Sequence, residues 1–363
     1  MRIALLHPCY WPEVRRGTER VIRELAGGLL ARGHEPVLIT SHPGRTSRSV
    51  EDGLRIVRAR RPRDDRWRAR GWDRYLAHAP RSLAELACAR ADVAHALYPS
   101  DAVAASAWTR PVVFSYMGLP DAAYLDERRG RRWTMQRACA RADAVVALSE
   151  ASARAFHDVL GVDARVISPG VDMTAFTPDP PRRADTPTIV CSAARAEPRK
   201  RVDLLVEAVR GMDGVRLVLD RRGPEIREPF VELRDLDDRA ALAGAYREAW
   251  VSVLPSVNEA FGLVLAEGLA CGTPAVAADR GGMPEVLGGR DDVGRTFSGD
   301  SPAALAQALR GALALHDDPR TPARCREQAQ RFSTDAATDA YVALYEELLQ
   351  RRRRRRNGAS TSR

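Results

Sequence analysis

The sequence predicts an α/β protein with two doubly wound parallel-sheet domains that face each other across a cleft. Three observations lead to this prediction. Short apolar runs alternate with helix-period segments, a proline-rich break interrupts them near residue 180, and a length of 363 residues suits two domains of ordinary size. In open sheets of this class, ligands bind outside the carboxyl ends of the strands.

The first half of the chain begins with a buried strand and continues in a βαβ rhythm. Residues 2–7 (RIALLH) form the strand, and residues 18–32 form a helix with Val21, Ile22 and Leu25 on one face. Further apolar runs, mostly separated by helical stretches, predict strands at 36–40, 92–97, 111–115, 143–148 and 164–168. We therefore expect a first domain at 1–176.

A linker is expected at 177–187 (TPDPPRRADTP), which has four prolines and no apolar periodicity. The alternation then restarts and predicts a second domain at 188–334. Its expected strands are 188–193, 215–219, 249–254 and 274–278, and the expected helices are 202–210, 239–248, 263–271 and 302–315, with a last helix at 335–350.

Composition excludes several classes of protein. No apolar run approaches the length of a membrane span, and the first residues do not read as a signal peptide. The six cysteines are scattered without a CxxC pair, which argues against a zinc site or a disulfide framework and favours a cytoplasmic setting. Neither a GxGxxG turn nor a GxxxxGK[ST] loop is present.

The segment 254–286 carries the chemistry. It reads as a strand end, a loop with Glu259, and a helix from about Leu263, so the amides of Phe261, Gly262 and Leu263 would be free donors for phosphate. Gly262 would let a ligand approach the backbone closely. Glu267, one turn into the helix, could accept hydrogen bonds from two vicinal hydroxyls.

These residues resemble the Glu-x7-Glu signature of the retaining glycosyltransferases of family 4, which have the GT-B fold. The segments A31-RGHEPVLIT, A142-DAVVALSEAS and I167-SPGVDMTAF are similar to other family segments. A194-RAEPRKR is similar to the family loop Gly-Arg-Leu-x-x-x-Lys-Gly, with Arg195 and Lys200 at the family spacing. Lys200 is the only lysine in the chain, and a lysine and an arginine are not interchangeable at a phosphate site.

The resemblance implies a role for each matched residue. Arg195 and Lys200 would bind the diphosphate of a nucleotide-sugar donor, and Glu259 would hold the donor sugar. Glu267 would bind the ribose hydroxyls, the amides of 261–263 would contact sugar or phosphate, and Gly17 would approach the donor from the first domain. It also implies that the sugar is transferred with retention, without metal or cofactor, and that the last helix crosses back to the first domain.

Some positions depart from the family pattern. Leu97 and Met117 stand where family members often have histidine, and we interpret His95 as a buried strand residue. In the first loop Arg16-Gly17 replaces paired glycines, and Ser168-Pro169 replaces Pro-Asn. These departures leave open how the first domain handles the donor sugar. Asp235 and Asp237 resemble a metal-binding DxD pair, but we expect them to be loop or cap carboxylates.

Arginine-rich segments suggest an anionic partner. Residues 55–75 contain nine arginines with Trp67, Trp72 and Tyr75, and fit either a solvated loop or an interfacial patch. The expected disordered tail at 351–363 has seven arginines and no acid. A peripheral contact with an anionic membrane and a lipid-linked acceptor is therefore one expectation, and a soluble small-molecule acceptor is the other.

Two alternatives to the transferase remain open. One is a nucleotide-sugar epimerase or a phosphorylase-type enzyme of the same fold. The other, from a different class, is a nucleic-acid-binding protein that uses the basic tail, because the sequence pI is about 9.7. Against nucleic acid, the basic residues at 195 and 200 fall inside a complete donor-phosphate pattern. The base and sugar of the donor cannot be read from the sequence.

Overall fold

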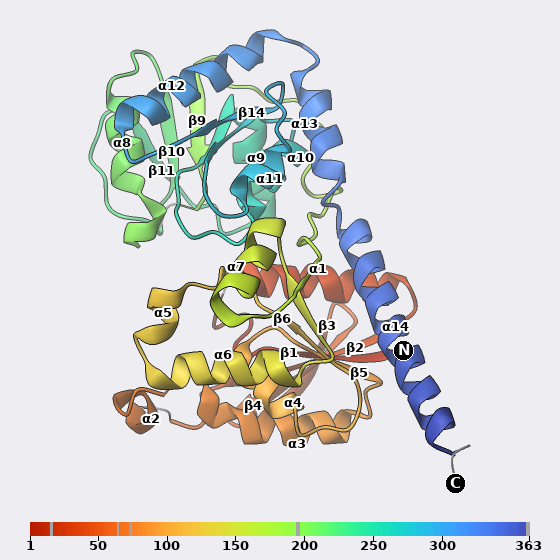
Figure 1. The fold of residues 1–363 in the computed structure, drawn as a ribbon. Coiled ribbons are helices and arrows are strands. Elements are labelled where there is room, and N and C mark those ends of the chain that lie inside the picture. Colours follow the sequence, from red (N-terminus) through yellow and green to blue (C-terminus); the bar gives the residue numbers. More distant parts are fainter. Residues whose placement is uncertain (15–16, 64, 73–74, 194–196, 361–363) are drawn as a thin grey trace. The chain divides into compact units, whose positions relative to one another are not determined.

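A computed structural model describes residues 1–14, 17–63, 65–72, 75–193 and 197–360. The chain divides into two compact units, Met1–Gly170 with Thr334–Arg363, and Val171–Ser333 (Figure 1). Both units contain a mainly parallel sheet with helices. This confirms the predicted class of two parallel-sheet α/β domains, and the cleft expected between them stays a prediction.

The first unit is built on an eight-stranded sheet with the order β3-β4-β2-β1-β5-β6-β7-β8. All neighbours are parallel except β3 and β4, which form an antiparallel edge. The strands are β1 (Arg2–Leu6), β2 (Glu35–His42), β3 (Ser47–Glu51), β4 (Leu54–Arg60), β5 (Val93–Ala96), β6 (Val112–Ser115), β7 (Ala144–Ala147) and β8 (Arg165–Val166).

Helices cover both faces of this sheet. Alternate side chains of β1 point to opposite faces: Ile3 and Leu5 pack with α1 and α14, and Ala4 and Leu6 pack with the helices of the other side. The helices are α1 (Gly17–Ala31), α2 (Asp65–Ala69), η1 (Leu76–His78), α3 (Ala79–Ala89), α4 (Pro99–Ala105), α5 (Ala122–Asp126), α6 (Arg129–Arg141), α7 (Glu150–Leu160) and α14 (Thr334–Ser360).

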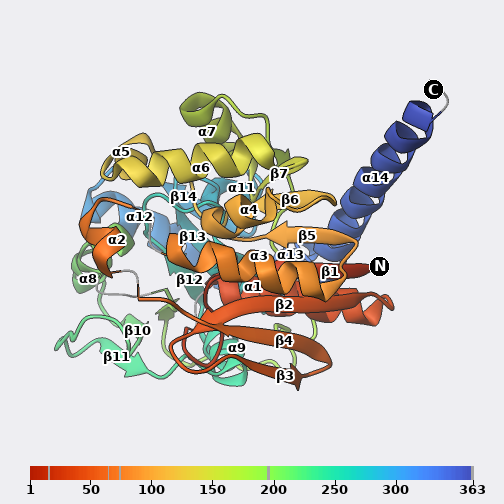
Figure 2. The same cartoon turned by 90° about the horizontal axis from the view of Figure 1, so that it is seen from below.

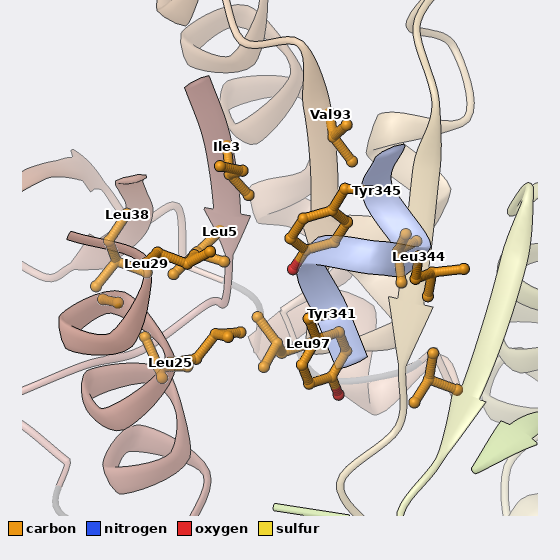
Figure 3. Close-up of a cluster of buried hydrophobic side chains, with 14 of the residues drawn as sticks. Ile3, Leu5, Leu25, Leu29, Leu38, Val93, Leu97, Tyr341, Leu344 and Tyr345 are labelled. Atoms are coloured by element: carbon orange, nitrogen blue, oxygen red, sulfur yellow. The ribbon is translucent and has the colours of Figure 1, made fainter. Parts of the chain in front are cut away.

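The C-terminal helix α14 is part of the first unit's core. Tyr341, Leu344 and Tyr345 lie beside Val93 of β5 and beside Leu97, which follows that strand (Figure 3). The helix continues through the arginine run to Ser360, where we expected a disordered tail from residue 351 (Figure 2). Arginine is a strong helix former, so a run of arginines can prolong a helix that packing has already nucleated.

The segment 55–75 is not a solvated loop throughout, contrary to one of its two interpretations. Its first residues belong to β4, a strand paired with β2 in which Leu54, Ile56 and Ala59 are buried. Tyr75, expected at a surface patch, is buried as well. Three of the seven residues of β4 are arginines, Arg55, Arg58 and Arg60, and this is why the segment resembled a charged loop.

The second unit contains a six-stranded parallel sheet with the order β11-β10-β9-β12-β13-β14. Its strands are β9 (Thr188–Cys191), β10 (Arg216–Asp220), β11 (Val231–Arg234), β12 (Val251–Leu254), β13 (Ala275–Ala278) and β14 (Gly294–Phe297). Its helices are η2 (Pro198–Lys200), α8 (Val202–Arg210), α9 (Arg239–Glu248), α10 (Leu263–Ala270), α11 (Met283–Leu287), α12 (Pro302–Leu313), η3 (Ala314–Asp317) and α13 (Thr321–Gln330).

The segment expected as a linker lies within the second unit, which begins at Val171. Arg183 anchors it, donating to the carbonyl oxygen of Gly272 at 2.6 Å, to Thr273 Oγ1 at 2.9 Å and to the carbonyl oxygen of Ala249. The first division of the chain therefore falls at 170/171, several residues before the prolines that marked it in the sequence. The second division falls at 333/334.

Candidate donor-binding site in the second unit

Lys200 and Glu259 form an ion pair. Lys200 ends the η2 turn that follows β9, and Glu259 lies in the loop that follows β12, the neighbouring strand. The Lys200 Nζ donates to Glu259 Oε1 at 2.7 Å, and a nitrogen of Arg199 donates to the same oxygen at 3.0 Å. The Lys200 and Glu259 side chains are only 12% and 19% exposed. The structure thus brings together two predicted site residues that are 59 positions apart.

Backbone contacts fix the loop that carries Glu259. The amide of Val257 donates to the Arg199 carbonyl at 2.9 Å, and the amide of Gly282 donates to the Glu259 carbonyl at 3.0 Å. Gly281 has φ +60°, and a Cβ there would lie 2.3 Å from the Glu259 carbonyl oxygen. A glycine is therefore required at 281 both by conformation and by space.

Helix α10 begins beside this loop at Gly262. Gly262 has φ +119°, a conformation that glycine adopts without strain. Within the described residues, the amides of Phe261, Gly262 and Leu263 have no hydrogen-bond acceptor, as expected at a helix start. The Phe261 ring packs edge-on against Phe332 at 5.0 Å and holds this turn against the core.

Glu267 is buried one turn into α10, with 2% of its surface exposed. The hydroxyl of Tyr246, at the end of α9, donates to its Oε2 over 3.4 Å and also lies 2.7 Å from Ser192 Oγ. Gly268 lets the helix approach β12 closely, because a Cβ there would lie 2.6 Å from Ser252 Oγ. The adjacent Glu267 is thereby kept at the end of the sheet.

Two predicted residues lie elsewhere. Arg195 falls in 194–196, outside the described residues. Gly17 belongs to the first unit, where it is the exposed first residue of α1, and a Cβ there would meet open space. The local structure does not demand glycine at 17, so its predicted contact with the donor stays a prediction.

The DxD-like carboxylates are paired with arginines. Arg221 donates to Asp235 Oδ2 at 2.7 Å, and Arg222 donates to Asp237. Arg222 also contacts both oxygens of the buried Asp220, at 2.5–3.2 Å. Each of the two aspartates thus already has a cationic partner, which agrees with their interpretation as loop carboxylates.

Within the described residues, His7, Cys9 and Glu19 form the one group of three side chains close enough to bind a metal ion. His7 Nδ1 donates to the carbonyl oxygen of Cys9 at 2.6 Å, and Cys9 Sγ donates to Glu19 Oε1 at 3.6 Å. Burial lowers the pKa of His7 to about 4 and raises the pKa of the Cys9 thiol to about 12, so the imidazole is neutral with its one proton on Nδ1 and the thiol keeps its proton. We interpret the group as a hydrogen-bonded clamp between the first loop and α1.

His95 is fully buried in β5 and contacts two hydroxyls. Its Nδ1 lies 2.7 Å from the Tyr345 hydroxyl and its Nε2 lies 2.7 Å from Ser115 Oγ. Burial lowers its pKa to about 3, so the ring is neutral. His95 links β5 and β6 to α14, in keeping with its interpretation as a buried strand residue. Leu97 and Met117 pack in or against the same core.

Comparison with known proteins first defines the class. Sucrose-phosphate synthase from Thermosynechococcus elongatus has a TM-score of 0.80 at 21% identity, covering 96% of this chain and 99% of that structure. Anabaena Alr3699/HepE in complex with UDP and glucose has a TM-score of 0.71 at 18% identity, covering 96% of this chain and 100% of that structure. At these identities the likeness shows the fold, which is the GT-B fold of glycosyltransferases.

Sequence comparison then gives the family. Residues 15–175 match Glycosyltransferase Family 4, and residues 186–314 match Glycosyl transferases group 1. Each of the two domains therefore matches a family of glycosyltransferases, and together the matches span most of the chain.

Among curated relatives, the D-inositol 3-phosphate glycosyltransferases of Xylanimonas cellulosilytica and Geodermatophilus obscurus are each 34% identical. The matches cover 62% and 60% of this chain and 62% and 56% of those relatives. The chain therefore spans about three-fifths of the length of the curated relatives it matches.

Within the described residues, none of the helices combines the length and the apolar character needed to cross a bilayer.

Sequence reasoning missed three residues that contact the predicted site: Arg199, Ser192 and Tyr246. Arg199 stood inside the matched loop, and its charge beside Lys200 was a usable signal. Ser192 follows β9 at the carboxyl edge of the sheet, where ligands are expected. Tyr246 gave no signal, because one tyrosine near the end of a predicted helix reads as a core residue.

Proposed function

We propose that the chain transfers a sugar, with retention of its anomeric configuration and without a metal ion, from a nucleoside diphosphate sugar to an acceptor hydroxyl. The observation that carries the proposal is the convergence of Lys200 and Glu259 beside the start of α10, one turn before Glu267. The family matches and the shared fold support it.

The proposed mechanism depends on stabilising the negative charge that develops on the leaving diphosphate. Cleavage of the bond between the anomeric carbon and the phosphate oxygen leaves an oxocarbenium-like sugar and a diphosphate with added negative charge. The Lys200 ammonium and the amides of 261–263 would stabilise that charge as fixed donors. A second carboxylate of the kind that glycosidases use is not needed, and we assign no nucleophile.

The ion pair indicates how the site responds to the donor. Glu259 Oε1 accepts from both Lys200 and Arg199. A diphosphate carries more negative charge than a carboxylate and would attract the ammonium. Arg199 would still neutralise Glu259, so Lys200 could turn to phosphate without leaving the half-buried carboxylate unpaired.

The substrates are proposed by class. The solved neighbours include complexes named for UDP-glucose and ADP, which supports a nucleotide-sugar donor. The acceptor is a hydroxyl compound, either small or lipid-linked. The name of the curated relatives makes D-inositol 3-phosphate the first acceptor to try.

A nucleoside diphosphate screen tests the proposal. Thermal unfolding of the full chain with UDP, GDP, ADP and dTDP should identify one that raises the Tm, because a ligand that binds the folded state stabilises it. Lys200→Ala should lower its affinity by about 10- to 100-fold, the usual loss for a hydrogen bond to a charged group. Arg227→Ala, an exposed arginine paired with Glu225, is the control.

The product then separates the proposal from its alternatives. With the matching donor sugar, NMR should show acceptor-dependent glycoside of unchanged anomeric configuration. Conversion of the donor to its epimer without acceptor would indicate an epimerase, and formation of a sugar 1-phosphate from inorganic phosphate would indicate a phosphorylase. Binding to RNA at physiological salt without nucleotide binding would contradict the enzyme altogether.

A further inference from the structure

A short chain of hydroxyl and carboxylate groups leads from the end of β9 into α10. Ser192 Oγ lies 2.7 Å from the hydroxyl oxygen of Tyr246, and that hydroxyl donates to Glu267 Oε2 over 3.4 Å. Tyr246 and Glu267 are 1% and 2% exposed. A tyrosine hydroxyl has one proton, so donation to Glu267 makes Ser192 the donor to Tyr246. Ser192 therefore donates to Tyr246, and Tyr246 donates to the Glu267 carboxylate.

Packing fixes the tyrosine ring. Tyr246 lies at the last turn of α9, and its ring contacts Phe176 edge-on at 6.2 Å. On the other side, Gly268 lets α10 pack against the ring, where a Cβ would approach Tyr246 Cδ1 to 3.5 Å. The hydroxyl is thus held at one point, and the carboxylate beside it has a fixed partner.

We propose that Tyr246 is a positioning residue that orients the Glu267 carboxylate toward the two ribose hydroxyls of the donor. The inference rests on the proposed function and adds to it the expectation that Glu267 accepts the ribose hydroxyls. A carboxylate at the end of a glutamate side chain can rotate, and a hydrogen bond to one oxygen removes that freedom. The separation of 3.4 Å exceeds the usual 2.5–3.0 Å for such a bond, so the effect of this contact is modest.

The inference predicts selection for ribonucleotides. An oriented, desolvated carboxylate accepts a hydrogen bond from each of the two ribose hydroxyls. Removal of a hydroxyl from the nucleotide removes one of these bonds and weakens binding. The ratio of the dissociation constants of the 2′,3′-dideoxy and ribose forms therefore measures how well the Glu267 carboxylate is oriented toward the ribose hydroxyls. General damage to the fold weakens both forms alike and leaves this ratio unchanged.

The experiment is calorimetric titration of the full chain with UDP, GDP and ADP and their 2′,3′-dideoxy forms. The wild type should bind one ribose form about 10- to 100-fold more tightly than its dideoxy form. Tyr246→Phe should weaken the ribose form by about 3- to 10-fold and leave the dideoxy form unchanged, so the ratio falls. Tyr345→Phe, which removes a buried tyrosine hydroxyl from its contact with His95 in the first unit, should lower the Tm and preserve the ratio.

Each other outcome has a definite meaning. An unchanged ratio in Tyr246→Phe, with both forms weakened equally or not at all, overturns the positioning role and leaves the proposed function standing. Equal binding of ribose and dideoxy forms by the wild type shows that Glu267 does not bind the diol, which also overturns the inference alone. Failure of all six nucleotides and of dTDP to bind the wild type overturns the proposed function and this inference together.

Discussion

Replacement of Gly281 by alanine should displace the backbone of Glu259 and thereby lower the activity. The new Cβ would lie 2.3 Å from the Glu259 carbonyl oxygen, and Cβ contacts below 3.0 Å essentially never occur. One of the two segments must therefore move by at least 0.7 Å (3.0 − 2.3). The hydrogen bond from the Gly282 amide to the same oxygen, 3.0 Å long, would be strained or lost.

Two costs set the size of the effect on stability. Alanine at φ +60° costs about 1–2 kcal/mol, and the weakened hydrogen bond costs about 1 kcal/mol more. For a domain of this size, each kcal/mol shifts the Tm by about 2–4 °C. Displacement of a catalytic group by about 1 Å commonly lowers the rate by about a hundredfold, so kcat/KM should fall by that order.

Gly289→Ala is the matched control. Gly289 has φ +71°, in the same unit, but a Cβ there would meet nothing within 4 Å. This variant should carry the conformational cost alone and keep its activity. Thermal unfolding and donor turnover are measured for both variants. If Gly281→Ala loses no more activity than Gly289→Ala, the contact at Glu259 does not govern the chemistry.

Three further outcomes are expected. Activity should survive EDTA, because Arg221 and Arg222 already pair with the DxD-like carboxylates. Loss of activity in EDTA, with recovery on addition of Mg²⁺ or Mn²⁺, would contradict this. The buried His95 has its pKa lowered to about 3, so the unfolded chain takes up a proton first and stability should fall as pH drops from about 6.5 toward 3. The free energy of unfolding, measured with urea at several pH values, should change less with pH in His95→Gln than in the wild type. The exposed arginines of 353–355 should bind anionic vesicles at low salt, by about 1 kcal/mol each, and truncation after residue 350 should abolish co-sedimentation. Absence of binding by the full chain at low salt excludes a membrane role for the tail.

The elements that the sequence predicted well have strong apolar periodicity. The helices at 202–210 and 239–248 have the expected bounds, because apolar residues alternate with charge at helical spacing and turn residues flank them. Strands β3, β4, β11 and β14 were missed. Each contains at least one arginine, so their composition resembles that of loops.

The site could be predicted only as far as local pattern and sheet topology reach. Glu259 and the start of α10 follow one strand, and Lys200 follows its neighbour in the sheet. Because parallel strands end at the same edge, their proximity follows from the fold class. Contacts such as Tyr246 with Glu267 depend on the packing of α9 against α10, which no local pattern encodes.

The single lysine differs in its contact from several arginines of the second unit. Arg222 and Arg234 each grip a carboxylate through both oxygens, as a planar guanidinium favours. Lys200 instead touches one oxygen of Glu259 at 2.7 Å, beside an arginine that already reaches the same atom. A compact ammonium can leave that oxygen for a phosphate by a small rotation, whereas a second guanidinium would be held by a two-point grip and would crowd Arg199. Lys200→Arg should therefore bind the nucleoside diphosphate more weakly although the charge is kept, and equal affinity would show that charge alone is required.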